Sequence, residues 1–592
     1  MNLSFLLPLL RETTAYKQLV EQLLAAKNGH KVVILDAAES YFIAALHDEL
    51  RLPVIVISAQ PERTRRLLGQ LQIWCPPSVN LHRFPELEFL LYEYPSSPSA
   101  NAIGEKVGPP HLPPYLARDN YAGDPPHLPP YLARDVWERL RVLSTLCHCE
   151  ERSDEAISET RLLRFAHNDQ NKCHSEHRDY HTTPSPASSL RSELRLTRVT
   201  AEQPPLIVTS ALAVIAKTIS QEDFTSACHI LTQGMVIDPL SLLRRWQLMG
   251  YETEDIVEVP GTMSRRGGIV DVFSPCSQMP ARIEFLGNKI ESIRLFDPES
   301  QCSTKPVESI VIIPAKEVGM FENSGSLLNY LPGNAVLVLD SPGEIKTAIE
   351  KLHREAQELR EVEVAGQKHG SLERGELPEN LHPHPSLSLE GRGLGVGVLR
   401  SRERSLFTWE ELEPEINARR CLSLEPWNIA ESGVQFLPFT LPRRYGGKLE
   451  DFFEYTKQMM EEKQRVLVVS HQANRLSELF QEKGIEVFPV SELKEIPSQG
   501  SITLLQSSPG QTRSHEPKAW QSSSIPAEGW RMNNLHLITD AELFGFVKQA
   551  KPVRSMPVRR RWLYPQLTEG DYVVHIDHGI GKFRGLTQIS TN

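Results

Sequence analysis

The sequence predicts a protein of several α/β domains, and three observations lead to this fold class. The chain has 592 residues, which is too long for one hydrophobic core, because globular domains average about 150 residues. Apolar runs at 32–35 and 54–58 flank an amphipathic segment, an order typical of a β–α–β unit with parallel strands. Hydrophobic residues make up 40% and charged residues 23% of the chain, as in folded soluble proteins. We therefore expect several layered domains, each with its own core.

Charge and cysteine content limit the classes of function. The 64 lysines and arginines face 75 acidic residues, a net charge of −11, so any site for an acidic partner must be a local basic patch. The eight cysteines lack paired spacing and suit a reducing cytosol. The apolar run 3–10 has no preceding cationic stretch and is too short to span a bilayer. We expect a cytoplasmic protein without membrane association.

The turn after the first predicted strand reads Asp36-Ala37-Ala38-Glu39. A nucleotide-binding domain carries a glycine-rich loop ending in Gly-Lys-Ser/Thr at this place, because backbone amides and a lysine hold the phosphates. Two carboxylates without a glycine would repel a triphosphate. No other segment has the required spacing. We interpret the turn as a degenerate phosphate loop and expect no cofactor and no catalytic residue.

Two stretches interrupt the α/β pattern. The motif Pro-Pro-His-Leu-Pro-Pro-Tyr-Leu-Ala-Arg-Asp occurs at 109–119 and again at 125–135, and polar, histidine-rich sequence follows. Prolines oppose helix and sheet, and two copies cannot bury a solenoid core. The cysteines and histidines at 147–177 lack zinc-ligand spacing, so we expect no metal site. We predict that 99–203 and a similar stretch at 366–405 are disordered insertions.

The middle of the chain predicts a β-hairpin. Apolar and polar residues alternate on both sides of Gly287-Asn288. With a three-residue loop, Ile283 would face Ile293 in the core and Arg282 would face Arg294 on the other side, whereas a two-residue loop would shift this pairing. On composition these arginines form a solvated sheet face.

Further α/β segments follow the hairpin. An apolar strand at 335–339 precedes an amphipathic helix at 344–359. Another strand at 466–470 is followed by a helix that ends at Gly484, and two more strands lie at 502–505 and 535–538. The segments from 466 onward predict a second, small α/β domain, and neither this group nor the one at 335–359 has a catalytic constellation.

The hairpin region resembles a known family. The segments Arg266-Gly-Gly-Ile-Val-Asp-Val-Phe-Ser-Pro275, Arg282-Ile-Glu-Phe-Leu-Gly287 and Ile290-Glu-Ser-Ile-Arg-Leu-Phe-Asp297 resemble the module shared by the excision-repair helicase UvrB and the bacterial transcription-repair coupling factors (Mfd). The resemblance implies docking on UvrA through Arg266, Arg282 and Leu286, the last at a position where some members have an aromatic residue. We add Arg294 to this UvrA-binding set. Guanidinium groups on a rigid strand can bind carboxylates of a partner bidentately.

The C-terminal stretch 570–586 resembles the opening hairpin of the RNA-polymerase interaction domain shared by coupling factors and CarD-type regulators. Considered only as sequence, it is a β-hairpin with an Asp-His-Gly turn. The resemblance implies contact with the RNA polymerase β subunit. Fewer residues follow Glu569 than the roughly 55 that a small barrel needs, so we expect a truncated SH3/Tudor-like domain whose polymerase binding is weak or lost. The residues of this partial site are Val573, His575, His578, Gly579 and Lys582.

The degenerate phosphate loop separates the chain from UvrB, so the resemblance favours the N-terminal part of a coupling factor. It implies a UvrB-like, degenerate RecA-type domain with an inserted β-rich domain. The expected units are 1–98 with 204–230 (domain 1a), 99–203 (insertion), 231–316 (UvrA docking), 317–365 with 406–440 (domain 1b), 366–405 (insertion), 441–550 (domain 3), 551–566 (linker) and 567–592 (CarD-like).

The implied function is recruitment of UvrA to stalled RNA polymerase in transcription-coupled nucleotide excision repair, as a scaffold without its own motor. The full-length family is an ATP-dependent DNA translocase. Contact with double-stranded DNA is a further expectation. Two alternatives remain open: a UvrB-like ATP-dependent DNA helicase, and an inert fragment of a broken gene. The expected DNA contacts are Arg554, Arg559, Arg560 and Arg561.

Overall fold

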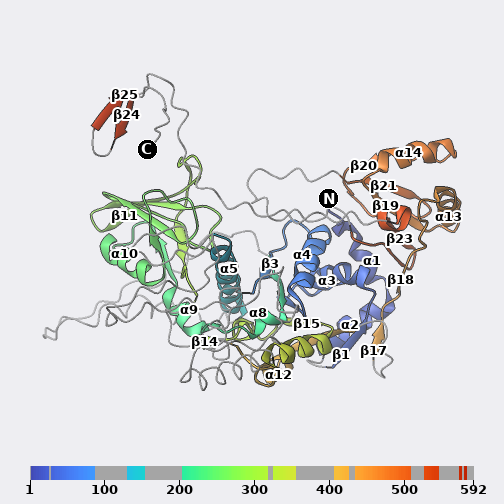
Figure 1. The fold of residues 1–592 in the computed structure, drawn as a ribbon, viewed down its shortest axis with the longest axis horizontal. Coiled ribbons are helices and arrows are strands. Elements are labelled where there is room, and N and C mark those ends of the chain that lie inside the picture. Colours follow the sequence, from blue (N-terminus) through green and yellow to red (C-terminus); the bar gives the residue numbers. More distant parts are fainter. Residues whose placement is uncertain are drawn as a thin grey trace, which may run out of the picture.

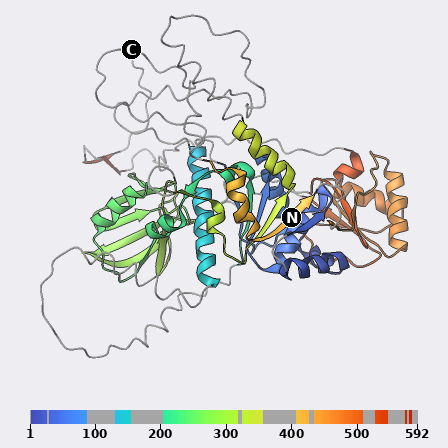
Figure 2. The ribbon, with the colours of Figure 1, turned by 90° about the horizontal axis from the view of Figure 1, so that it is seen from below.

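The computed structural model contains three folded units (Figure 1). The first α/β domain lies in the centre, a β-rich domain on one side of it, and a second α/β domain on the other (Figures 1 and 2). The structure describes residues 2–25, 29–86, 130–153, 203–317, 324–354, 406–425, 434–507, 526–545, 572–575 and 579–582.

A seven-stranded parallel sheet forms the first α/β domain. Both faces of its central strands are buried, which explains the continuous apolar runs in the sequence. The expected domains 1a and 1b share this one sheet. Strands from the part of the chain after residue 317 lie between strands from the part before residue 230. In spatial order the strands are β17 (Val434–Phe436), β1 (His30–Val33), β16 (Arg420–Glu425), β15 (Val336–Asp340), β2 (Val54–Ser58), β4 (Leu206–Ser210) and β3 (Leu81–Phe84).

Helices cover both faces of this sheet. Val54 and Val56 pack against the N-terminal helices, whereas Ile55 and Ile57 pack against the helices of the other face. One side carries η1 (Ser4–Leu6), α1 (Pro8–Arg11), α2 (Thr14–Ala25), α3 (Asp36–Leu50) and α4 (Pro61–Trp74). The other side carries α5 (Pro130–Ser153), α8 (Ala211–Ile215), α9 (Gln221–Ala227), η3 (Leu327–Tyr330), a helix at 342–354 and α12 (Trp409–Asn417).

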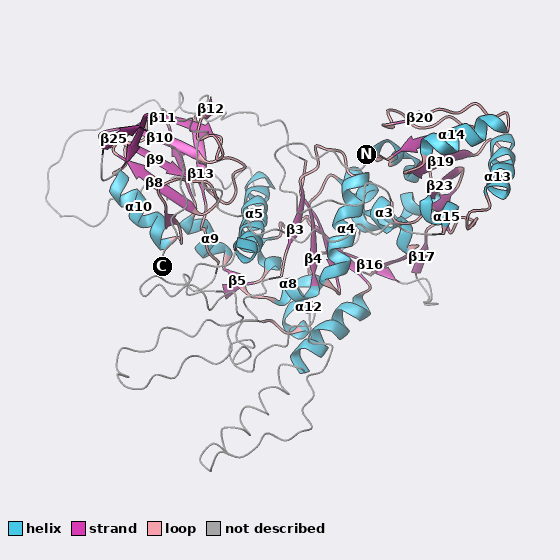
Figure 3. Cartoon of the chain, turned by 45° about the horizontal axis from the view of Figure 1, so that its top comes forward, coloured by secondary structure: helices cyan, strands magenta, loops and turns pink. Residues whose placement is uncertain are grey.

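The helix α5 lies inside the range 99–203, which the sequence predicts to be a disordered insertion. It stands between the β-rich domain and the parallel sheet (Figures 2 and 3), and it buries Val136, Leu140 and Leu143 in the core. The prediction of disorder is therefore wrong for 130–153. The second copy of the proline-rich motif runs into the start of this helix, where proline is well tolerated. The remainder of 99–203, and all of 366–405, lie outside the described residues.

The β-rich domain is a six-stranded sheet covered on one face by α10 (Pro239–Leu248). The predicted hairpin is confirmed, and its loop has two residues because Leu286 pairs with Lys289. A bulge after Glu284 then restores the pairing of Arg282 with Arg294. The strands are, in order, β12 (Ser303–Pro306), β11 (Lys289–Phe296), β10 (Ala281–Leu286), β9 (Ile269–Val272), β8 (Thr262–Arg266) and β7 (Glu252–Thr253).

Two short antiparallel pairs flank this domain. The strand β6 (His229–Thr232) pairs with β13 (Ser309–Ile312), and β5 (Thr218–Ile219) pairs with β14 (Ser324–Gly325). The β-rich domain thus enters and leaves the first α/β domain at neighbouring places, between β4 and β15 of its sheet in chain order.

The second α/β domain contacts the first through an aromatic cluster. The ring of Trp530 lies 4.7 Å from Tyr41 and 6.0 Å from Trp74, measured between centroids. Its sheet includes Phe439–Thr440, and this corrects the predicted boundary, because 406–440 is expected in domain 1b. The strands are β18 (Phe439–Thr440), β22 (Trp530–Met532), β23 (Leu535–Thr539), β19 (Arg465–Ser470), β21 (Ile502–Gln506) and β20 (Pro489–Val490), with helices α13 (Leu449–Glu461), α14 (Ala473–Glu482) and α15 (Asp540–Phe544).

A separate antiparallel pair, β24 (Tyr572–His575) with β25 (Gly579–Lys582), lies near the C-terminus. This agrees with the predicted hairpin there. In the described part of the chain, no helix has the length and apolar character needed to cross a bilayer.

Candidate docking surface

The β-rich sheet has an inner and an outer face. Side chains alternate along each strand, so Val270, Ile283 and Ile293 pack under α10 on the inner face. We call the opposite side the outer face. It carries Arg266, Ile269, Asp271, Arg282, Glu284, Leu286, Lys289, Ser292 and Arg294.

A buried carboxylate organises the outer face. The side chain of Asp271 is only 2% exposed. Its two oxygens accept hydrogen bonds from Arg282, with Nε to Oδ1 at 2.8 Å and Nη2 to Oδ2 at 2.9 Å. Arg266 Nη2 also donates to Oδ2, at 3.3 Å. One carboxylate therefore holds two guanidinium groups, and the bidentate bond goes to Arg282.

The two arginines differ in what they can offer a partner. The side chain of Arg282 is 19% exposed, lies over the ring of Phe296 at 4.6 Å, and donates a further bond to the carbonyl of Gln301. Hydrogen bonding to Asp271 raises its pKa, so the charge is permanent. Arg266 is 56% exposed and makes a single longer bond. The structure thus presents Arg266 outward and uses most of the Arg282 donors internally.

The like charges of Arg282 and Arg294 face each other across the hairpin, an arrangement that is unfavourable without compensation. Each has its own carboxylate. Arg294 Nη2 lies 3.2 Å from Glu284 Oε2, which also accepts a 2.6 Å bond from the Ser292 hydroxyl. The repulsion between the arginines is therefore relieved on both sides, and Arg294 remains about half exposed.

Of the predicted docking residues, Arg266, Leu286 and Arg294 are exposed on the outer face, and Leu286 is the most open at 71%. Sequence reasoning missed Asp271. A carboxylate at an alternate position of Ile269-Val-Asp-Val272 could have indicated it, since a charge among apolar strand residues needs a buried partner. The surface combines outward cations with an apolar side chain, which suits an acidic partner surface that also has an apolar contact.

The degenerate phosphate loop forms a second cluster, at the carboxyl edge of the parallel sheet. Arg63 on α4 donates from Nε to Asp340 Oδ2 at 2.8 Å, and its Nη2 donates to Glu39. A weaker contact of 3.5 Å reaches Asp36. Desolvation, and next the charge of Asp340, raise the pKa of Glu39 to about 8. Ion-paired side chains thus stand at the edge where ligands of parallel α/β sheets bind.

Sequence reasoning missed Arg63 and Asp340 in this cluster. The sequence does contain a pattern that indicates Asp340. Four apolar residues followed by an aspartate resemble the strand of P-loop enzymes whose aspartate binds Mg²⁺. Ala37 and Ala38 lie in the first turn of α3 and have no side-chain donor for a phosphate.

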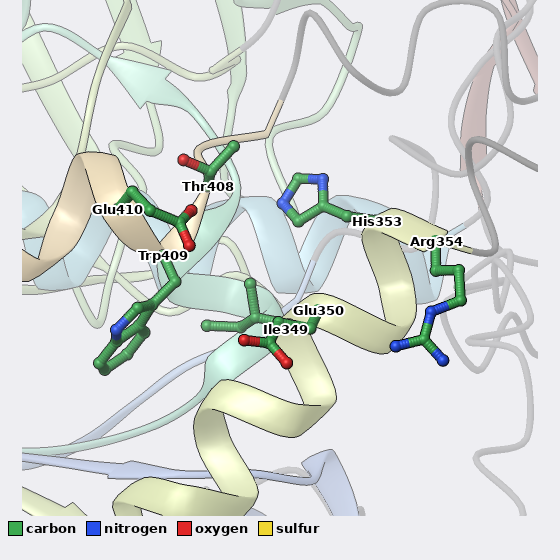
Figure 4. Close-up of a pocket in the computed structure, with 7 residues that line it drawn as sticks. All are labelled: Ile349, Glu350, His353, Arg354, Thr408, Trp409 and Glu410. Carbon is green, nitrogen blue, oxygen red and sulfur yellow. The ribbon is translucent and has the colours of Figure 1, made fainter.

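A cavity of about 290 Å³ lies between the helix at 342–354 and the start of α12 (Figure 4). His353 Nε2 is 3.2 Å from the carbonyl oxygen of Phe407. Within the described ranges, no three His, Cys, Asp or Glu side chains are close enough to hold a metal ion. The lining of the cavity consists of Ile349, Glu350, His353, Arg354, Thr408, Trp409 and Glu410.

The fold defines the class of this chain: a multidomain α/β protein that carries a β-rich domain inserted within its first α/β domain. Comparison with known proteins identifies the inserted domain. Residues 230–318 match the model of the UvrB interaction domain, and residues 567–592 match that of the CarD-like/TRCF RID domain.

Whole-chain comparison gives the particular relatives. The chain is 25% identical over 465 residues to the transcription-repair-coupling factor of Bacillus subtilis, covering 67% of this chain and 36% of the relative. Against that of Myxococcus xanthus, identity is 26% over 455 residues, covering 66% and 35%. The UvrABC system protein B of Chlorobaculum tepidum is 33% identical over 112 residues, which are 19% of this chain and 16% of that protein.

The resemblance inferred from the sequence motifs is confirmed. The chain is similar to the N-terminal region of transcription-repair coupling factors, with a UvrB-like module and the start of a CarD-like domain. It spans about a third of the length of the two coupling factors that match it over most of its residues.

Proposed function

We propose that this chain recruits UvrA to stalled RNA polymerase in transcription-coupled nucleotide excision repair. The observation that carries the proposal is the outer face of the β-rich domain, where Asp271 holds Arg266 and Arg282 beside an exposed Leu286. The match to the UvrB interaction domain supports UvrA as the partner of this face.

The geometry explains how such a face would bind. Arg266 is held on a strand by Asp271 before any partner arrives, so little side-chain entropy is lost on docking. Its remaining donors can pair with a partner carboxylate, and desolvated arginines frequently dominate interface energy. Arg282 acts behind it, because it neutralises the carboxylate that both arginines share.

In this proposal the first α/β domain is a scaffold of degenerate RecA type and not a motor. Arg63, Glu39 and Asp340 fill the edge of the sheet with ion pairs, and the helix α3 starts with two carboxylates in its first turn. A triphosphate would have to displace a cation and approach these acids, which is electrostatically unfavourable. We assign no ATP hydrolysis to the described residues.

RNA polymerase is the second proposed partner, through its β subunit. The CarD-like match supports it, and four of the expected contact residues lie on the β24–β25 hairpin, where His575 pairs with Gly579. His578 lies outside the described residues, as do the arginines at 554 and 559–561 expected to contact DNA. The other two expected contact residues on this hairpin are Val573 and Lys582.

A competition assay tests this function. If the chain and UvrB share one mode of docking, titrating the chain into a preformed UvrA–UvrB complex should release UvrB, because both would need the same UvrA surface. Released UvrB is quantified by size-exclusion chromatography or fluorescence anisotropy. Formation of a stable complex containing all three proteins would contradict the proposal.

A further inference from the structure

We infer that the UvrA-docking surface extends beyond the hairpin onto Val236, so that the partner must present an apolar segment beside its carboxylates. This inference rests on the proposed function. Val236 is 74% exposed and lies on a segment that precedes α10 and is separate from the predicted docking residues.

The backbone places Val236 on the outer face. The amide of Gly234 donates to the carbonyl of Ile290 at 2.8 Å, and the amide of Ile237 donates to that of Asn288 at 2.7 Å. These bonds hold the segment 234–237 alongside the start of β11 in an isolated antiparallel bridge, with Val236 directly opposite Lys289.

Cross-strand pairing then forms a continuous row. Lys289 lies opposite Val236 on one side and opposite Leu286 on the other. Residues directly opposite each other in antiparallel strands project to the same face. The row Val236–Lys289–Leu286 therefore lies on one face of the sheet, and both of its apolar members are more than two-thirds exposed.

The row continues into the arginine region. Ile269 lies on the outer face opposite Arg266 on one side and Glu284 on the other, and it is also an exposed apolar side chain. Leu286 follows Glu284 by two residues and so shares its face. Apolar side chains thus extend from the docking arginine to Val236 without a change of face.

Charge identifies the kind of partner. Glu284 is bonded to Ser292 and Arg294, and Asp271 is buried beneath its two arginines. Arg266 and Lys289 therefore flank the apolar side chains as outward cations, with Glu291 at the bulge as the nearby acid. The complementary surface carries carboxylates around an apolar ridge, and continuity with the arginines assigns it to the same UvrA partner.

The test is the dissociation constant of the full chain with UvrA. Val236→Asp should weaken binding at least tenfold, because it places a carboxylate against acidic residues and removes apolar area. Val236→Leu should preserve binding, and Val236→Ser should weaken it less than Val236→Asp. The matched control is Leu248→Asp. Leu248 is 76% exposed but lies on α10, which covers the inner face, so this change should leave the constant unaltered.

Each result has a distinct consequence. Wild-type binding with an unchanged constant for Val236→Asp overturns the extension of the surface and leaves the proposed function intact. Equal weakening by Val236→Asp and Leu248→Asp also overturns it, because the effect would then be nonspecific. Absence of wild-type binding overturns both the function and the extension. Melting temperatures of Val236→Asp and Val236→Ser, measured in parallel, distinguish lost binding from lost folding.

Discussion

Asp271 lies beneath two arginines, and the way it is bonded makes Arg266 and Arg282 unequal. The sequence motif predicted both residues as docking anchors and predicted the strands that carry them. It could not predict which guanidinium group stays exposed to a partner, because this depends on the bidentate hydrogen bond between Arg282 and Asp271 on neighbouring strands. Removing Arg282 would leave a buried carboxylate with one weak partner, so a loss of binding in that variant would mix docking with folding.

The cluster of Arg63, Glu39 and Asp340 gives a prediction on stability. Arg63→Ala should lower the free energy of unfolding at neutral pH by about 3 kcal/mol, because the buried Asp340 carboxylate loses its cation and Glu39 loses a hydrogen-bond donor. Chemical unfolding of variant and wild type measures the difference. The control is Arg475→Ala on α14, whose exposed side chain pairs with the equally exposed Glu478 and should cost less than about 1 kcal/mol.

The pKa of Glu39 sets the pH dependence of this difference. Its folded value of about 8 exceeds the ordinary 4.5, so the protonated form stabilises the fold fully below about pH 4.5. That contribution is lost as the pH rises through about 8. Above that pH the ionised Glu39 is stabilised by the charge of Arg63. The loss of unfolding free energy caused by Arg63→Ala should therefore be larger at pH 9 than at pH 6. An equal or smaller loss at pH 9 would refute this account of the cluster.

At the scale of elements, the strands and the hairpin could be predicted because their signal is local alternation or a continuous apolar run. The helix α5 could not, although Val136, Leu140 and Leu143 follow helical spacing. Its first residues belong to a proline-rich repeat, and its partners are far away in sequence. Arg139, for example, pairs with Glu317, which is 178 residues away in sequence and follows the strands of the β-rich domain.

The position of α5 suggests a mechanical role. Arg139 is fully buried, donates bidentately to Glu317, bonds the carbonyl of Pro85, and lies 4.0 Å over the ring of Phe84. Two residues further on, Arg141 donates to carbonyls at 275 and 277 in the β-rich domain. One helix thus contacts both domains and connects the β-rich domain to the parallel sheet.

The corresponding prediction concerns Arg139→Ala. It should destabilise the chain by about 3 to 5 kcal/mol, because Glu317 would be left buried and unpaired with a cation. Urea unfolding measures this loss. Arg134→Ala removes a more exposed pair with Glu138 on the same helix and should change stability by less than about 1 kcal/mol. A loss for Arg139→Ala no greater than for that control would show that α5 is not an anchor.

At the scale of the whole molecule, the chain places the β-rich domain on one side of the parallel α/β sheet and a second α/β domain on the other (Figure 3). Several domains and their order could be predicted from sequence. The family resemblance implied one α/β domain interrupted by the β-rich domain, but the pairing of β1 with β16 and β17 could not be predicted, because it is non-local and has no periodic signal. The aromatic contact around Trp530 was missed for the same reason.

The central claim is that the outer face binds UvrA, and the most direct test is the dissociation constant of the complex for two sets of variants. Arg266→Ala with Arg294→Ala removes two exposed cations and leaves the Arg282–Asp271 pair intact. We predict about a hundredfold weaker binding, equivalent to about 2.7 kcal/mol. Arg265→Ala removes an exposed neighbour whose side chain projects to the other face and should leave the constant unchanged. Equal affinity for wild type, the double variant and Arg265→Ala would contradict the account.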